Sequence, residues 1–534
     1  MKKIKKIFSI SAKQYLWSVI LVLLIATVLR FYNLGNVPHG MTWDEAAIGY
    51  NGYAIFTTRR DEWLKRLPIS FWSFGDYKAP LAIYLNGFFT FLFGMNLFAV
   101  RFPFAVFGVM AILGFILWLK LFLEEQSWEE NQSRLWSLVG GVLLTFSPWH
   151  LHYSRAGFES GMALSLMIWG LFFWQKFWQK NSKKNTLWLL LFTISWVAAI
   201  YSYHSAKIFI PLLGLLLVWQ KRTLLRENIS KLSISAVLGL VGLAPFVYDS
   251  IFGKGLERAG TLIFSQKLSF IELIKTVIYQ AWAHLSPSFL FFGETTTLRH
   301  GDGRGGVLLL TTGLACLLAI FTLFKNKKKP NKLTIFSLWL IFLGFLPAIL
   351  GTEVPHSNRG LLALPGFILL AVSGLKSLPE MIKNRSVKYF LTLFFFGHLI
   401  LFAGYLNSYY KNFAAESADA FQDGYLEAFE FVIPYEKGLD DKPKVDKIIF
   451  SSDYGQPYIY ALFARKTNPI WYQGGSLIKY EFKDEVTIGD LERKNTIVVA
   501  SNEDELLGEN DKADHIVYGS DGSIRFRIYL NLGE

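Results

Sequence analysis

The chain has 534 residues, of which 52% are hydrophobic and only 18% are charged, and its formal net charge is +13. Length alone would allow roughly three or four soluble domains, but this composition excludes an ordinary soluble protein. The basic residues stand in short clusters between apolar segments, which is typical of loops at a membrane surface and argues against nucleic acid as a partner. The single cysteine, Cys316, excludes an intrachain disulfide, a cysteine-based zinc site and an iron–sulfur cluster.

Long segments without charge predict membrane-spanning helices. Crossing the hydrocarbon core takes roughly 20 mainly apolar residues, and a charge at its centre costs about 2.5–3.5 kcal/mol. The N-terminus could pass for a signal peptide, but no small-residue cleavage site follows, so we expect a retained first helix. We predict eleven spans, over residues 14–31, 99–121, 135–150, 160–177, 186–203, 207–220, 232–248, 306–324, 333–350, 360–375 and 389–406.

The distribution of lysine and arginine predicts the sidedness of the chain. Cytoplasmic loops carry an excess of these residues, and the clusters within 2–6, 176–184, 221–226, 325–329 and 383–388 all fall on one side of the predicted spans. The loop near 122–134 is rich in glutamate, which counts little in this rule. A cytoplasmic N-terminus therefore places every unusual polar cluster on the outer face, and this convergence predicts a single site there.

The predicted fold is a polytopic α-helical membrane protein with juxtamembrane helices and a C-terminal α/β domain outside the membrane. We expect a transmembrane domain over 1–406, with long outer loops at 32–98 and 249–305, and a soluble domain over 407–534. The apolar stretch 80–93 is too short to span and should lie in the interface or re-enter, and residues 271–285 should form a helix along the membrane surface. In the soluble domain we expect strands at 447–451, 496–500, 515–518 and 524–530, and a helix at 423–431.

The first outer loop contains adjacent carboxylates, Asp44 and Glu45, directly after Thr42. Thr42 and Glu45 have the spacing of a helix capping box. Asp44 also suits a general base, because neighbouring carboxylates repel and one can be held at a useful pKa. Both interpretations can hold together. Lys78 either extends its ammonium group to the membrane interface or binds a phosphate at headgroup depth.

Two further outer clusters each have a structural and a functional interpretation. Arg155 and Glu159 are four residues apart and would pair on a helix. Arg359 follows His356 at the predicted start of a span, where the helix dipole opposes a cation. It therefore either binds an anion or reaches lipid headgroups.

Read in chain order, these motifs resemble the membrane glycosyltransferases that use polyprenyl-phosphate sugars, namely the protein O-mannosyltransferase and lipid A aminoarabinose transferase group with the GT-C fold. The resemblance covers about the first 375 residues, and the C-terminal domain is not matched. Two departures are Ala79, where the family often has a second proline, and Glu159, where it more often has aspartate. The matching residues are Asn33-Leu34-Gly35, Trp43-Asp44-Glu45, Tyr77-Lys78-Ala79-Pro80-Leu81, Phe93-Gly94, Arg101-Phe102-Pro103, Ser147-Pro148, Ser154-Arg155 with Glu159, and Arg359 with Leu364-Pro365.

This resemblance implies an inverting glycosyl transfer to an acceptor hydroxyl at the outer membrane face. A carboxylate would accept the hydroxyl proton, and cations would stabilise the departing lipid phosphate. A divalent metal is compatible with this reaction and not required, and no other cofactor is expected. The partners would be the lipid-linked donor, membrane lipids and an acceptor left open among protein, lipid and wall polymer. The expected roles are Asp44 and Glu45 in catalysis, Lys78, Arg359 and Arg155 at the donor phosphate, and Glu159, Tyr77, His152, His356 and His204 around the substrate.

The alternative is a transporter or flippase of lipid-linked sugars without transferase activity. A transporter would have ionisable residues at mid-membrane depth and interrupted, repeated helices. Asp249, at the end of a predicted span, is the nearest candidate for such a residue.

Overall fold

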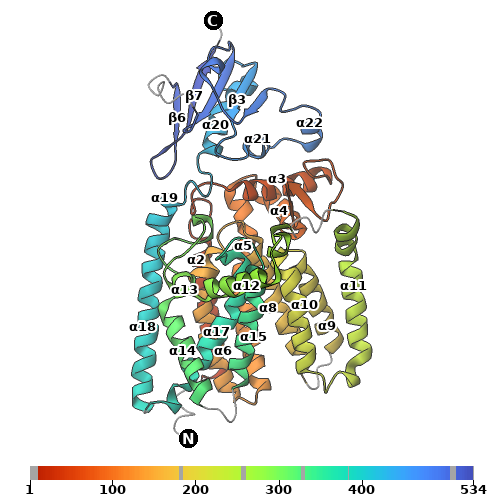
Figure 1. Cartoon of the computed structure of the whole chain (residues 1–534), viewed down its shortest axis with the longest axis vertical. Coiled ribbons are helices and arrows are strands. Elements are labelled where there is room, and N and C mark those ends of the chain that lie inside the picture. The colour runs from red at the N-terminus through yellow and green to blue at the C-terminus, as the bar shows by residue number, and fades with distance from the viewer. Residues whose placement is uncertain are drawn as a thin grey trace. The chain divides into compact units, whose positions relative to one another are not determined.

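The computed structural model describes residues 10–179, 184–253, 260–325, 331–382, 384–504 and 513–532 (Figure 1). The chain forms two compact units. One, here called the helical unit, comprises Met1–Tyr32 and Phe104–Ser408, and the other, here called the mixed unit, comprises Asn33–Pro103 and Tyr409–Glu534.

The helical unit is a bundle of long apolar helices with short helices in its connections (Figure 1). Helix α5 begins in the mixed unit and continues into this bundle. The helices are α2 (Ala12–Phe31), α5 (Leu97–Glu125), α6 (Glu130–Thr145), α7 (Pro148–His152), α8 (Glu159–Phe177), α9 (Asn185–Ile200), α10 (His204–Gln220), α11 (Ile229–Phe252), α12 (Phe270–Leu285), α13 (Pro287–Phe291), α14 (Leu310–Lys325), α15 (Lys332–Ile349), α16 (Ser357–Gly360), α17 (Leu364–Ser377) and α18 (Asn384–Ser408).

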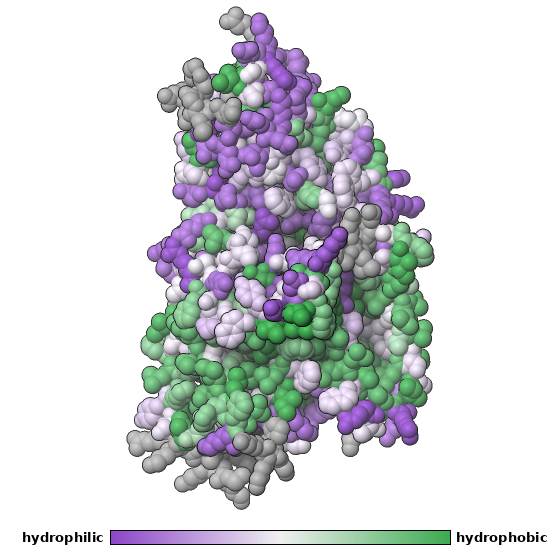
Figure 2. Space-filling model, viewed as in Figure 1, coloured by the Kyte–Doolittle hydropathy of each residue, from purple (hydrophilic) through white to green (hydrophobic). Residues whose placement is uncertain are grey.

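Each of the predicted spans overlaps one of these helices. Among the described residues, six helices are long and apolar enough to cross a membrane. Large apolar side chains such as Trp17 on α2 and Leu240 on α11 are exposed, and Figure 2 shows a broad hydrophobic surface over this unit. A surface of this kind is stable only in contact with lipid, so the chain is a multi-pass membrane protein. The basic clusters at 2–6, at 180 and 183, and at 327–329 lie outside the described residues.

Helix α12 confirms the helix expected at 271–285. It begins with a capping box between Ser269 and Glu272. Its burial is inverted relative to a soluble helix, since Ile278 and Trp282 are exposed while Gln280 and His284 are buried. An exposed apolar face of this kind fits a membrane interface, where the amphipathic helix would lie along the surface.

The mixed unit combines the loop over residues 33–103 with the C-terminal region. Its five-stranded sheet has the order β4-β3-β5-β7-β6, with β3 parallel to both β4 and β5 and β7 antiparallel to both β5 and β6. The four predicted strands are confirmed, as is the predicted helix. The elements are α3 (Trp43–Thr58), β1 (Phe71–Ser73), β2 (Asp76–Lys78), α4 (Pro80–Phe93), α19 (Ala414–Glu416), α20 (Tyr425–Lys437), β3 (Lys447–Ser451), α21 (Pro457–Arg465), α22 (Pro469–Gln473), β4 (Tyr480–Lys483), β5 (Thr496–Ser501), β6 (His515–Tyr518) and β7 (Ile524–Asn531).

One hydrophobic core joins the two parts of the mixed unit. Met41 and Tyr50 share this core with Phe463 and other residues of the C-terminal region. The Tyr460 hydroxyl donates a 2.7 Å hydrogen bond to the Met41 carbonyl, and the Tyr50 hydroxyl donates one of 2.9 Å to the Thr467 carbonyl. Residues 33–103 therefore pack with the C-terminal region, which differs from the division at residue 407 that the sequence suggested. The reason is that these contacts are long-range and have no local sequence pattern.

Candidate active site

The start of α3 fixes the position of Asp44. Thr42 is the N-cap residue, its hydroxyl accepts a 3.1 Å hydrogen bond from the Glu45 amide, and Glu45 Oε2 accepts one of 3.1 Å from the Thr42 amide. The predicted capping box is therefore present. Since Glu45 turns back onto the helix start, Asp44 occupies the first turn with its side chain on another face, where its negative charge is favoured by the helix dipole.

Glu45 is also held by a buried ion pair with Arg101. Arg101 Nε lies 2.7 Å from Glu45 Oε1 and Arg101 Nη2 lies 3.1 Å from Oε2, and both side chains are buried. The same guanidinium donates hydrogen bonds to the carbonyls of Leu34 (3.3 Å), Pro38 (2.8 Å) and Gly40 (2.9 Å). Arg101 thus ties the chain before α3 to the start of α5. Both oxygens of Glu45 serve this framework, which favours Asp44 over Glu45 as the reactive carboxylate.

Asp44 forms an ion pair with Lys78. The two side chains differ in burial, since Lys78 is 4% exposed and Asp44 is 39% exposed. Lys78 ends the β1–β2 hairpin, in which Lys78 pairs with Phe71, and its Nζ lies 5.4 Å from the centre of the Phe74 ring. The hairpin thus presents a cation on a largely buried stem beside a carboxylate that solvent reaches.

Tyr77, the neighbour of Lys78 in the hairpin, pairs with Trp72 on the opposite strand. Its backbone amide donates a 2.7 Å hydrogen bond to Asp76 Oδ1. The side chain of Tyr77 is partly exposed, and as the neighbour of Lys78 in a strand it points to the other face of the hairpin.

Glu62 is a functional candidate that the sequence analysis did not single out. It is fully buried, and its Oε1 accepts hydrogen bonds from Asn51 Nδ2 of α3 (3.0 Å) and from the Ser73 hydroxyl of β1 (2.8 Å). Burial raises the pKa of Glu62 to about 7. Glu62 therefore connects the helix that carries Asp44 with the hairpin that carries Lys78. Glu62 follows Asp61, so the adjacent carboxylates that drew attention to Asp44 and Glu45 recur here and could have marked it, but nothing local signals its burial.

In the helical unit, Glu353, His356 and Arg359 form a second cluster. His356 Nε2 lies 3.3 Å from Glu353 Oε2, and Arg359 Nη2 lies 4.0 Å from the same oxygen. Burial lowers the pKa of His356, although its hydrogen bond with Glu353 acts in the opposite direction. A Cβ at Gly351 would come within 2.2 Å of Arg359 Nη1, so glycine at this position makes room for the guanidinium.

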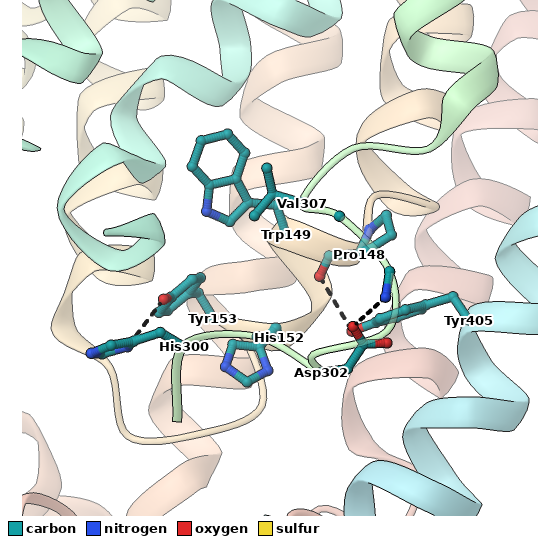
Figure 3. Close-up of a pocket in the computed structure, with 11 residues that line it drawn as sticks. Pro148, Trp149, His152, Tyr153, His300, Asp302, Val307 and Tyr405 are labelled. Carbon is teal, nitrogen blue, oxygen red and sulfur yellow. Dashed lines mark hydrogen bonds between the residues drawn. The ribbon is translucent and has the colours of Figure 1, made fainter. Parts of the chain in front are cut away.

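His152 lies beside this second cluster. Its Nε2 is 2.9 Å from the Arg299 carbonyl, and burial lowers its pKa to about 4, so the ring is neutral at pH 7. Figure 3 shows His152, Tyr153 and His300 around a cavity of about 30 Å³, with the Tyr153 hydroxyl 3.3 Å from His300 Nδ1. The His300 ring packs against the His356 ring in a tilted arrangement, with 4.5 Å between centroids and 37° between the ring planes. A cavity of this volume has room for a water molecule and not for a sugar.

Arg155, Glu159 and His204 are three further predicted residues of the helical unit. Arg155 is fully buried and donates hydrogen bonds to the carbonyls of Leu29 (2.9 Å) and Arg30 (3.1 Å) at the end of α2. Residues 153–157 form turns and bends, and α8 begins only at Glu159, so the helical spacing assumed for an Arg155–Glu159 pair does not apply. His204 begins α10, and its Nδ1 lies 3.2 Å from Lys207 Nζ.

No group of three or more His, Cys, Asp or Glu side chains that could hold a metal ion occurs among the described residues. The histidines near His356 therefore do not form a metal site with the described acidic residues. Their hydrogen bonds to backbone groups indicate a role in holding the loops together, as when the His356 amide donates to His284 Nε2 at 3.1 Å.

Comparison with solved structures shows which fold this is. ArnT from Cupriavidus metallidurans bound to undecaprenyl phosphate matches with a TM-score of 0.55 and 12% identity, over 98% of this chain and 99% of that chain. The apo state of the same protein matches with a TM-score of 0.54 and 12% identity, over 96% and 97%. The oligosaccharyltransferase AglB from Archaeoglobus fulgidus was solved in complex with an inhibitory peptide and a dolichol-phosphate. It matches with a TM-score of 0.50 and 13% identity, over 84% of this chain and 64% of that chain.

The chain thus has the GT-C fold of membrane glycosyltransferases, with a C-terminal sheet domain. Residues 77–248 match the family described as dolichyl-phosphate-mannose-protein mannosyltransferase. A search of curated proteins by sequence found no match. The resemblance predicted from the sequence, to polyprenyl-phosphate-dependent glycosyltransferases, is confirmed by the family match and the fold together.

Proposed function

We propose that this protein transfers a sugar from a polyprenyl-phosphate carrier to an acceptor hydroxyl, with inversion at the anomeric carbon. The family match over residues 77–248 and the fold support this reaction class. The neighbours ArnT and AglB were solved with undecaprenyl phosphate and dolichol-phosphate respectively, which supports a lipid phosphate as the carrier. The sugar and the acceptor stay open among hexose or pentose and among protein, lipid and wall polymer.

The observation that carries the proposal is the ion pair between Asp44 and Lys78. In the transfer, the acceptor oxygen forms a bond to the anomeric carbon and its proton moves to a carboxylate. The bond from that carbon to the phosphate oxygen breaks, and the lipid phosphate leaves with the electron pair. Asp44 would accept the proton as general base, and Lys78 would stabilise the charge on the leaving phosphate.

The burial difference within the pair supports this division of roles. Lys78 has a buried stem, so the position of its ammonium group is held by the hairpin, and preorganised charge of this kind stabilises a developing anion. Asp44 is accessible enough to meet an acceptor. A bound lipid phosphate would compete with Asp44 for the Lys78 ammonium and so release the carboxylate to act as a base.

Arg359 stays a prediction as a ligand of a lipid phosphate, judged from its own surroundings in the helical unit. Its side chain is 21% exposed, and Glu353 lies near it at 4.0 Å, too far for a tight bidentate pair. Arg155 is a weaker candidate, because its guanidinium is buried on the carbonyls that end α2. Five further residues stay predictions as substrate-lining or supporting residues, namely Glu159, Tyr77, His152, His356 and His204.

We further propose that the N-terminus is cytoplasmic and the C-terminal domain extracytoplasmic, as the basic loops indicate. A cysteine placed at Asp440, an exposed position of the mixed unit, should react in intact cells with a membrane-impermeant maleimide. Labelling only after the membrane is permeabilised would reverse the orientation.

The experiment that tests the proposed reaction follows the fate of the donor. Purified protein in liposomes is given a polyprenyl-phosphate sugar with radiolabel in the sugar, and free polyprenyl phosphate is measured together with the labelled product. A glycosyltransferase releases polyprenyl phosphate as the sugar is transferred or hydrolysed. If the intact donor instead crosses the bilayer without being consumed, the protein is a transporter and the proposal is wrong.

A further inference from the structure

A large cavity opens in the helical unit at the end opposite to α16. Its volume is about 540 Å³, within the range of roughly 300–1,000 Å³ that is usual for ligand pockets. It lies among the C-terminal ends of α5, α8 and α10 and the first turns of α15. Its apolar walls consist mainly of large side chains, chiefly Trp118, Phe122, Trp174, Leu217, Phe336 and Trp339.

The rim of this cavity carries an excess of positive charge. Lys221, Arg222 and Lys332 line it together with one carboxylate, Glu125. Lys221 forms an ion pair with Glu125, which also accepts a hydrogen bond from the Gln175 amide. One of the three cations is therefore neutralised, and the rim keeps a net charge of about +2, since three cations stand against one anion.

The exposed part of the rim is aromatic as well as basic. Trp339 on α15 and Trp219 on α10 both line the cavity and are about half exposed, and the Arg222 guanidinium lies 5.2 Å from the Trp219 ring. Tryptophan and basic side chains gather where a membrane helix meets the lipid headgroups. The cavity therefore lies at headgroup depth and extends between helices into the apolar part of the bundle.

We propose that this cavity binds one membrane lipid with an anionic phosphate headgroup. The phosphate lies against Arg222 and Lys332, and an acyl chain fills the aromatic interior between α8 and α15. A small water-soluble anion would need the basic rim but not the large aromatic interior beneath it. This site is separate from Asp44 and Lys78, and it does not depend on the proposed transferase activity.

The charge on the rim identifies the headgroup as anionic. Basic residues near a membrane surface each contribute about 1 kcal/mol to attraction for anionic lipid. The C-terminal ends of α5, α8 and α10 also attract cations, which accounts in part for Lys221 beside Glu125. The helix dipole does not account for Lys332, because this residue begins α15, at the helix end where the dipole opposes a cation.

The test measures lipid retention by the whole protein. The chain is purified from membranes supplemented with either phosphatidylglycerol or phosphatidylcholine, and bound lipid is counted by native mass spectrometry. The double variant Arg222→Gln/Lys332→Gln removes the two cations that would hold the phosphate, and Ile335→Trp fills the mouth of the cavity from a position that is 38% exposed. Matched controls are Arg226→Gln/Lys231→Gln and Leu338→Trp, whose side chains do not line the cavity.

We expect the native chain to retain a single phosphatidylglycerol, and both cavity variants to lose it while the controls keep it. Removing two cations should weaken retention by about 20- to 30-fold, because 1.4 kcal/mol corresponds to a factor of ten. Equal retention of phosphatidylcholine would contradict the claim that the site selects an anionic headgroup. If Ile335→Trp retains lipid as the native chain does, the lipid does not bind in this cavity. If inorganic phosphate alone displaces the ligand, the site binds an anion and not a lipid. None of these outcomes depends on turnover, so failure here is distinct from failure of the transferase assignment.

Discussion

Lys78 and Asp44 form an ion pair in which the cation is almost fully buried while the carboxylate is accessible to solvent. An exposed pair contributes little to stability, and a fully buried pair seldom stabilises a fold beyond its desolvation cost. A half-buried pair whose two members come from different elements is better suited to a site where one partner can be exchanged. We therefore propose that the donor phosphate replaces Asp44 as the partner of the Lys78 ammonium group.

Replacing Lys78 should impair use of the donor. Lys78→Gln removes the charge that would stabilise the leaving phosphate, and the loss of one such group costs about 10²–10³ in rate. We expect kcat/KM for the polyprenyl-phosphate sugar to fall by about that factor, with partial recovery in Lys78→Arg. Lys444→Gln, an exposed lysine of the same unit, should retain activity. Unchanged kinetics in Lys78→Gln would remove this residue from the site.

Arg101 should act on stability rather than on chemistry. Arg101→Met leaves Glu45 buried without its cation, and breaking a buried pair costs about 3–5 kcal/mol. We expect a strongly lowered unfolding temperature, whereas Arg134→Met, whose ion-pair partner Glu130 is 60% exposed, should change stability by less than about 1 kcal/mol. A variant Arg101→Met that keeps its stability but loses turnover would mean that Glu45 takes part in the reaction.

Glu62 should make the stability of the mixed unit depend on pH. Its pKa is raised from 4.5 to about 7 in the folded chain, so between these values the folded state binds more protons than the unfolded state. Stability then falls as pH rises from about 4.5 to about 7, by up to about 3 kcal/mol, and stays low above that. Thermal unfolding at several pH values measures this slope.

The control for this pH effect is isosteric. Glu62→Gln keeps the hydrogen-bonding shape and removes the titration, so the slope between pH 4.5 and 7 should flatten. Glu430→Gln, on an exposed position of α20, should leave the slope in place. An unchanged slope in Glu62→Gln would assign the titration to another group.

The crossing of α3 and α4 should tolerate no side chain at Gly87. A Cβ there would lie 2.5 Å from the Gly52 carbonyl oxygen, which is backbone and cannot move aside cheaply. Gly87→Ala should destabilise the mixed unit by about 1–3 kcal/mol, the usual cost of overpacking. Gly489→Ala, whose Cβ would meet nothing closer than 3.8 Å, serves as the control. Equal unfolding temperatures for the two variants would contradict this packing.

Much of the fold could be predicted because it follows local patterns. The spans are charge-free segments of fixed length, and the capping box at Thr42 and Glu45 is a short-range motif. Strand β4 escaped prediction because it has only four residues, too few for the alternation of Tyr480 and Phe482 with Glu481 and Lys483 to stand out. Its position beside β3 comes from pairing between segments that lie far apart in the chain.

The candidate site was predictable only in part, for the same physical reason. Asp44 and Lys78 could each be singled out, but their pairing depends on a hairpin and a helix that meet through tertiary contacts. Arg101 entered only as part of a motif, although an arginine close to an apolar helix is itself a signal that a buried anion is near. The burial of Arg155 on the end of α2 has no local signature.

The most direct test of the central claim is single-turnover transfer by Asp44→Asn beside Asp440→Asn. Both changes replace one carboxylate with an amide, and Asp440 is an exposed aspartate of the same unit. We expect Asp44→Asn to bind the polyprenyl-phosphate sugar and to unfold at a temperature close to that of the native chain. It should release polyprenyl phosphate at least 10²-fold more slowly, because a general base contributes roughly 10²–10⁴-fold to the rate. Asp440→Asn should transfer sugar at the native rate. Full turnover by Asp44→Asn would contradict the account.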